Sequence, residues 1–112
     1  MDPSPPYYAV IFTSEHADAA EGYAETAEAM LALAARQPGF LGVDHARDSV
    51  GITISYWSSL EAIAAWKQQA DHRVAQQKGK DLWYRRYTVR ICRVEREYSF
   101  NRRHSGEDLP GS

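Results

Sequence analysis

Residues 56–87 read YWSSLEAIAAWKQQADHRVAQQKGKDLWYRRY, and this stretch decides the fold. It contains all three tryptophans, three of the seven tyrosines and one of the four histidines. Aromatic residues gathered with a His and with several Lys and Arg indicate either the thick part of a core or the wall of an apolar pocket. A run rich in β-branched and aromatic residues ends at Trp57. A helix-forming run follows, and a Tyr-rich run begins at Trp83. The stretch therefore predicts a strand, a helix and a strand.

The helix in this stretch has recognisable start signals. Ser58 or Ser59 can cap it, and Glu61 is favourable in its first turn. We expect a second helical piece over residues 72–80, because no Pro or Gly interrupts the chain before Gly79. The last strand is expected over residues 83–98.

Alternation along the flanking strands makes two predictions about side-chain direction. Tyr56 and Trp57 are adjacent and should face opposite sides of the sheet. Tyr84 and Tyr87 are three residues apart, so only one of them should face the helices.

Upstream of this stretch, the chain alternates between the two kinds of element. Residues 7–13 form an apolar run of strand length, and residues 18–36 are rich in helix-forming Ala, Glu, Met and Leu with one apolar stripe. Pro38 and Gly39 end that helix. Residues 40–45 and 51–57 are expected to form two antiparallel strands, joined through the polar residues 47–49. Residues 1–6 are a Pro-rich leader, 7–98 the domain, and 99–112 a polar tail.

The order β-α-β-β-α-β predicts an α+β, ferredoxin-like protomer, in which a four-stranded antiparallel sheet carries both helices on one face. The other face is then open. The first strand is apolar on both sides, since Tyr7, Ala9 and Ile11 alternate with further apolar residues. An exposed apolar sheet face needs a partner, so we expect a homodimer packed through it.

The overall composition restricts the classes of function. A chain of 112 residues is one domain, and 13 basic against 15 acidic side chains leave a net charge of −2, which disfavours nucleic acid and anionic membranes as partners. The single cysteine, Cys92, excludes an intrachain disulfide and a cysteine-cluster metal site. There is no apolar run of about 18 residues and no basic-then-apolar segment at the start, so we expect neither a membrane span nor a signal peptide. A cytoplasmic protein is expected, with no metal site.

Several segments together resemble one known family. They are PGFLG at residues 38–42, the strand ending in Tyr56 and Trp57, SLEAIAAW at 59–66, HRVAQQKG at 72–79 and WYRRY at 83–87. In these segments, and over about residues 7–98, the chain resembles the antibiotic biosynthesis monooxygenase (ABM) family. The resemblance implies a dimeric α+β barrel of ferredoxin-like protomers. It also implies either cofactor-free oxygenation of aromatic polyketides by molecular oxygen or oxidative degradation of haem.

The motifs of the two branches are only partly present. In the haem-degrading branch, a His follows the helix Trp by nine or ten residues, whereas Trp66 is followed at those distances by Ala75 and Gln76. The nearby His72 comes six residues after Trp66, and the first strand lacks the Asn of that branch. In the oxygenase branch, Trp57 matches a Trp at the end of the third strand, but Thr53 stands where that branch has Asn.

The main hypothesis is a cofactor-free monooxygenase acting on a small, flat, aromatic or polyketide-like substrate, with oxygen as co-substrate. His72 is the predicted catalytic base, since an unperturbed imidazole has a pKa of about 6.5. The predicted substrate-binding residues are Trp57 and Trp66 as apolar walls, Thr53 at the Asn position, and Tyr87 or Arg90 orienting an oxyanion.

Structural alternatives stay open for these residues. Trp66 can instead anchor its helix, and His72 can be a surface or capping residue after Asp71. His16 and His45 are expected to be exposed at strand ends. The alternative functions are a dimer that binds a small molecule without catalysis, and a haem-binding or haem-degrading protein.

Overall fold

The computed structural model describes residues 4–16, 23–77 and 84–102, and of these the side chains of residues 23, 24, 26 and 72–77 lie outside what is described. The elements follow the expected order β-α-β-β-α-β. They are β1 (Tyr7–His16), α1 (Tyr23–Ala34), β2 (Phe40–Arg47), β3 (Gly51–Trp57), α2 (Leu60–Gln77) and β4 (Tyr84–Val94).

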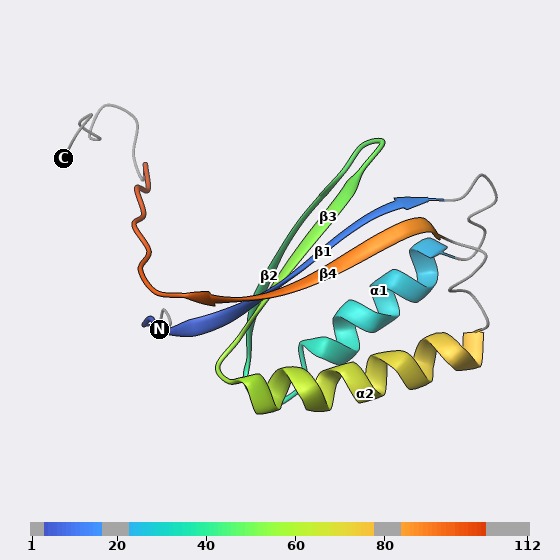
Figure 1. The fold of residues 1–112 in the computed structure, drawn as a ribbon, viewed down its shortest axis with the longest axis horizontal. Coiled ribbons are helices and arrows are strands. Elements are labelled where there is room, and N and C mark those ends of the chain that lie inside the picture. Colours follow the sequence, from blue (N-terminus) through green and yellow to red (C-terminus); the bar gives the residue numbers. More distant parts are fainter. Residues whose placement is uncertain (1–3, 17–22, 78–83, 103–112) are drawn as a thin grey trace.

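The four strands form one antiparallel sheet in the order β2-β3-β1-β4. Both helices lie on the same face of this sheet, and none of the described helices covers the opposite face (Figure 1). The chain therefore has the α+β, ferredoxin-like fold expected from its sequence, with β2 and β4 as the two edge strands.

A glycine turn joins α1 to β2 and sets the position of α2. The amide of Gln37 donates to the carbonyl of Ala34 at 2.9 Å as α1 ends. Gly39 then has a φ of 88°, a backbone conformation that favours glycine. Its carbonyl accepts a hydrogen bond of 2.8 Å from the amide of Ser58, immediately before α2. The turn thus ties the start of β2 to the start of α2.

Helix α2 is one unbroken helix. The hydroxyl of Ser59 accepts a hydrogen bond of 3.1 Å from the amide of Ala62, so Ser59 is the cap. The helix continues through His72 to Gln77, so the expected second helical piece follows the first without a break, since no Pro or Gly interrupts it. Residues 78–80 of the expected second piece lie outside the described residues.

Strand β4 ends at Val94, earlier than expected. Residues 95–102 run away from the sheet (Figure 1), and on them Tyr98 and Phe100 are 86% and 61% exposed. Without a neighbouring strand the chain makes no ladder hydrogen bonds here, although its side chains still favour extended backbone. The outer parts of the expected leader and tail, residues 1–3 and 103–112, lie outside the described residues.

The core lies between the helices and the sheet. Ala34 of α1, Trp57 of β3 and Ile63 of α2 are buried, and partly buried side chains pack around them: Tyr8, Val10, Phe40, Ala62 and Trp66. Trp57 is 0% exposed, and its indole N–H donates to the Ser55 hydroxyl at 2.9 Å. Tyr56 next to it packs edge-on against Tyr7 with ring centroids 6.1 Å apart. The expected opposition of Tyr56 and Trp57 is confirmed.

Strand register arranges the side chains of each face into rows across the sheet. We call the face that packs against α1 and α2 the helix side and the other the open side. The helix-side rows, from β2 to β4, are Phe40-Trp57-Tyr8-Arg93, Val43-Ser55-Val10-Ile91, His45-Thr53-Phe12-Val89 and Arg47-Gly51-Ser14-Tyr87. The open-side rows are Gly42-Tyr56-Ala9-Cys92, Asp44-Ile54-Ile11-Arg90 and Ala46-Ile52-Thr13-Thr88.

Candidate active site

The helices leave part of the helix side uncovered along β4. Tyr87, Val89 and Ile91 all face the helix layer, yet they are 38%, 47% and 52% exposed. Their row neighbours on β1 include Val10, which packs on the core beside Trp57. We call Tyr87, Val89 and Ile91 the β4 strip. A strip of exposed apolar side chains next to a buried core is the surface on which a flat apolar molecule can lie.

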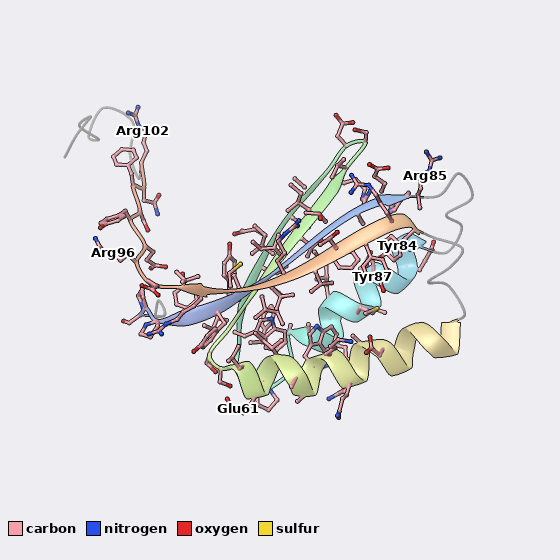
Figure 2. All side chains as sticks on the ribbon, viewed as in Figure 1. Glu61, Tyr84, Arg85, Tyr87, Arg96 and Arg102 are labelled. Carbon is pink, nitrogen blue, oxygen red and sulfur yellow. The ribbon has the colours of Figure 1, made fainter. Side chains whose placement is uncertain are left out.

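An aromatic cluster stands at one end of the β4 strip. Phe12 stacks on Tyr87, with centroids 5.3 Å apart and planes at 25°, and meets Tyr84 edge-on at 5.5 Å. Tyr84 and Tyr87 also contact each other at 5.4 Å (Figure 2). The expectation that only one of the two tyrosines faces the helices is therefore wrong. The physical reason is a register irregularity between Glu15 and His16, which breaks simple alternation at the start of β4.

Polar side chains continue across the sheet from this cluster. Thr53 lies beside Phe12 in the same helix-side row, with His45 on its other side. In the next row, Nη2 of Arg47 donates to the hydroxyl of the buried Ser14 at 2.5 Å, and Ser14 pairs with Tyr87. The site thus combines an aromatic wall with one cationic group and several hydroxyls.

Gly51 makes room for Arg47. A Cβ atom at Gly51 would lie 2.0 Å from Nη2 of Arg47, so only glycine lets the guanidinium cross the strand to reach Ser14. A fixed guanidinium next to an aromatic wall can stabilise negative charge that develops on a bound ring.

His16 is the described imidazole nearest the aromatic cluster. Its ring centroid lies 6.1 Å from that of Tyr84. Burial lowers the pKa of His16 below its ordinary value of 6.5, and the positive charge of Arg47 lowers this pKa further. His16 is therefore neutral near pH 7, the form that can accept a proton.

The structure brings some of the predicted site residues together and separates others. Thr53 and Tyr87 lie in adjacent helix-side rows, and the partly buried Trp66 stacks on Trp57 at 6.1 Å within the core. Arg90 lies on the open side, because it is three residues from Tyr87 on a regular strand. Helix α2 includes His72, whose side chain lies outside the described residues.

Sequence reasoning did not identify Phe12, Ser14 or Arg47 as site residues. Arg47 was expected only in a polar connection, and its partner Ser14 is 33 residues away in the chain. A usable signal was present at Gly51, since a glycine opening a strand can indicate close approach by another group. His45 is exposed at the edge strand, as expected, whereas the expected exposure of His16 is wrong, because this side chain is partly buried and its Nε2 is inaccessible.

Comparison with known proteins identifies the family. The model of the family described as antibiotic biosynthesis monooxygenase matches residues 6–78. The uncharacterized protein YqjZ of Bacillus subtilis (strain 168) is 51% identical over 100 residues, which are 88% of each chain. The chain belongs to the ABM family.

Solved structures agree with this ABM fold. PA3566 from Pseudomonas aeruginosa superposes with a TM-score of 0.63 at 20% identity, covering 84% of this chain and 97% of the other. SnoaB from Streptomyces nogalater, a cofactor-independent oxygenase, superposes with a TM-score of 0.64 at 14% identity, covering 88% and 100%. At these identities the two structures support the ABM fold alone.

The open side of this ABM protomer has its own hollow. It has a volume of about 440 Å³ and is lined by Tyr7, Leu41, Asp44, Tyr56, Glu97, Tyr98 and Ser99. The Tyr56 hydroxyl donates to Oδ2 of Asp44 at 2.8 Å, and that of Tyr7 donates to Glu97. Burial, followed by the bond to Asp44, raises the pKa of Tyr56 to about 12. Both phenols therefore stay protonated and neutral near pH 7.

Within residues 4–16, 23–77 and 84–102 of this ABM chain, no group of three or more His, Cys, Asp and Glu side chains is arranged to hold a metal ion. No helix in the same ranges is long and apolar enough to cross a membrane.

Proposed function

We propose that this ABM protein is a cofactor-free monooxygenase that acts on a small, flat, aromatic or polyketide-like substrate with molecular oxygen. The observation that carries the proposal is the β4 strip, because apolar side chains that face the helix layer are normally covered by it. A planar ring laid on this strip would meet the Phe12, Tyr84 and Tyr87 cluster at one end. Aromatic stacking would then orient it.

The surrounding side chains suit the charge that such a reaction develops. Removal of a proton from an activated carbon gives an electron-rich carbanion, whose charge is delocalised onto a ring oxygen. The hydroxyls of Tyr87 and Thr53 would donate to that oxygen, and the Arg47 guanidinium would add positive charge behind Ser14. Arg90 takes no part, since it lies on the open side. Trp66 forms the inner wall, with Trp57 buried behind it.

The proposed chemistry balances without a cofactor. The carbanion transfers one electron to oxygen, and the resulting radical pair combines at carbon to form a peroxide. Loss of water from the peroxide leaves a carbonyl, so a CH₂ group loses two hydrogens and gains one oxygen atom, while the second oxygen atom leaves as water.

The proposed base is His72, on the C-terminal half of α2. That half lies at the same end of the molecule as Tyr84 and Tyr87 (Figure 2). His16 is a second imidazole near the aromatic cluster, and its lowered pKa also favours the neutral form. The variants His72→Ala and His16→Ala separate the two. Loss of turnover only in His16→Ala would reassign the role, and unchanged turnover in both would refute His72 and His16 as the base.

Oxygen uptake with a panel of quinols and polyketide-like phenols tests the function. We expect uptake with at least one compound, and we expect Tyr87→Phe to lower it at least tenfold, the effect of one lost oxyanion hydrogen bond. Tyr98→Phe is the matched control, because Tyr98 is exposed beyond β4 and should keep full activity. If Tyr87→Phe is as active as Tyr98→Phe, the Tyr87 hydroxyl has no role in the reaction.

A non-catalytic dimer that binds small molecules is the second candidate. It is favoured by Thr53, whose single hydroxyl offers fewer hydrogen bonds than the Asn of the oxygenase branch. A panel compound that raises the melting temperature without oxygen uptake or product would support the binder and contradict the enzyme.

Haem degradation is the weakest candidate. The positions nine and ten residues after Trp66 hold Ala75 and Gln76, and the unbroken α2 provides no break near Asp71 that would re-aim His72. These residues do not fit the haem site of that branch. A Soret shift on adding haemin would contradict this conclusion.

The proposal includes a homodimer formed through the open side, in the cytoplasm. The open side is more apolar than a surface that stays in contact with water usually is. It carries the exposed Ile52 and Cys92 and the partly exposed Ile11 and Ile54. A lone unpaired cysteine also suits a reducing compartment.

A further inference from the structure

The middle row of the open side has opposite charges at its two ends. It runs from Asp44 on edge strand β2, through Ile54 and Ile11, to Arg90 on edge strand β4. The rows on either side contain uncharged residues only: Gly42-Tyr56-Ala9-Cys92 and Ala46-Ile52-Thr13-Thr88. Asp44 and Arg90 are thus the two charged residues of these three rows, and beyond the rows the Glu97 carboxylate lies beside Tyr7 in the open-side hollow.

These two charges are too far apart to pair within one protomer. They are separated by three strand spacings, about 14 Å, which exceeds the screening length of about 8 Å at physiological ionic strength. The next pair along the same face, Arg86 and Glu15, is already joined at 2.8 Å. Among the described residues, none forms an ion pair or hydrogen bond with Arg90.

We propose that a second copy of this chain covers the open side with its two-fold axis along the strands, so that each Asp44 pairs with the partner's Arg90. The inference rests on the homodimer of the proposed function and adds its orientation and its contact pair. In this arrangement β2 of one protomer lies over β4 of the other, and beside the axis Ile54 of each protomer faces the partner's Ile11.

Charge complementarity selects this axis over its main alternative. If the axis ran along the rows instead, Asp44 would lie over the partner's Asp44, and Arg90 over the partner's Arg90. Like charges placed face to face are unfavourable, so that arrangement is disfavoured. Facing sheets lie about 10 Å apart, a gap that an arginine and an aspartate side chain together can span.

The open-side hollow adds an independent reason to place a guanidinium at Asp44. Asp44 lines this 440 Å³ hollow together with the rings of Tyr7 and Tyr56. The bond from the Tyr56 hydroxyl to Oδ2 holds the carboxylate in position. Tyrosine rings beside a carboxylate suit an arginine, which can stack on one and ion-pair with the other.

Charge reversal tests the pairing, with the dimer dissociation constant measured by sedimentation equilibrium. Asp44→Arg and Arg90→Asp should each raise this constant about tenfold or more, because two-fold symmetry places like charges together twice. The double variant should return to within about threefold of wild type. An equimolar mixture of the two single variants should form a heterodimer, in which both pairs are again of opposite charge.

One control variant isolates the pair. Asp48→Arg reverses an exposed charge in the β2–β3 turn and should dimerise as wild type does. Circular dichroism checks folding. If a single reversal unfolds the protein, the neutral variants Asp44→Asn and Arg90→Gln replace it and should also weaken the dimer.

The outcomes separate this inference from the proposed function. A wild-type protein that stays monomeric would refute the homodimer and the pairing together, whereas oxygen uptake would still report on the enzyme. A dimer insensitive to both single reversals, or a double variant that stays weak, would refute the pairing and leave the homodimer standing.

Discussion

Replacing Gly39 with alanine should destabilise the fold through the turn that joins β2 to α2. The φ of 88° at this position costs an L-residue roughly 1–2 kcal/mol. A Cβ there would also lie 2.7 Å from Cβ of Ala62 and 2.8 Å from the Ser58 hydroxyl, and such overpacking typically costs about 1–3 kcal/mol. Reduced entropy of the unfolded chain returns about 0.4–1 kcal/mol. The expected net loss in the free energy of unfolding is about 1–5 kcal/mol.

Urea denaturation followed by tryptophan fluorescence measures this loss, at one protein concentration for all variants because dimerisation also contributes to stability. Gly42→Ala is the matched control. A Cβ at Gly42 would have Cδ2 of Tyr56 as its nearest neighbour, at 4.0 Å, so a change within about 0.5 kcal/mol is expected. If Gly39→Ala loses no more stability than Gly42→Ala, the strain assigned to the turn is wrong.

Three further predictions follow from the described contacts. Trp57→Ala should lose about 3–5 kcal/mol of unfolding free energy in urea, because the ring is fully buried; a smaller loss would show that the core collapses around the gap. Gly51→Ala should displace Arg47 and leave the buried Ser14 hydroxyl without its donor, costing about 1–3 kcal/mol, whereas wild-type stability would contradict the close approach. The lowered pKa of His16 means that the unfolded chain binds its proton more tightly. Melting temperature should therefore fall as the pH drops below 6.5, and His16→Asn should flatten this dependence; an unchanged slope would refute it.

The elements themselves were predictable because their signals are local. Apolar alternation, the helix-forming run of α1 and the Pro38-Gly39 turn act over a few residues, and the structure places β1, α1, β2 and β3 close to where they were expected. The end of β4 was not predictable in this way. Residues 95–98 have the composition of a strand, but a strand also needs a neighbour, and β1 begins only at Tyr7, which pairs with Val94.

The candidate site was predictable only in part. Trp57, Trp66, Thr53 and Tyr87 are all on the helix side or in its core, and their role as a site stays a prediction. The separation of Arg90 from Tyr87 could have been deduced from their odd spacing on one strand. By contrast, the contact between Tyr84 and Tyr87 depends on the register irregularity at Glu15 and His16. No local sequence pattern predicts this irregularity.

By itself, the sequence determined the order of the elements, the family, and the aromatic and polar residues available for a site, because these depend on residues close together in the chain. Only the tertiary structure decided which of them share a face and a row. Antiparallel register brings Thr53 beside Phe12 and Arg47 to Ser14 on the helix side, and aligns Asp44 with Arg90 on the open side. Such register is set by long-range pairing and core packing, and a shift of one residue would move every side chain of a strand to the other face.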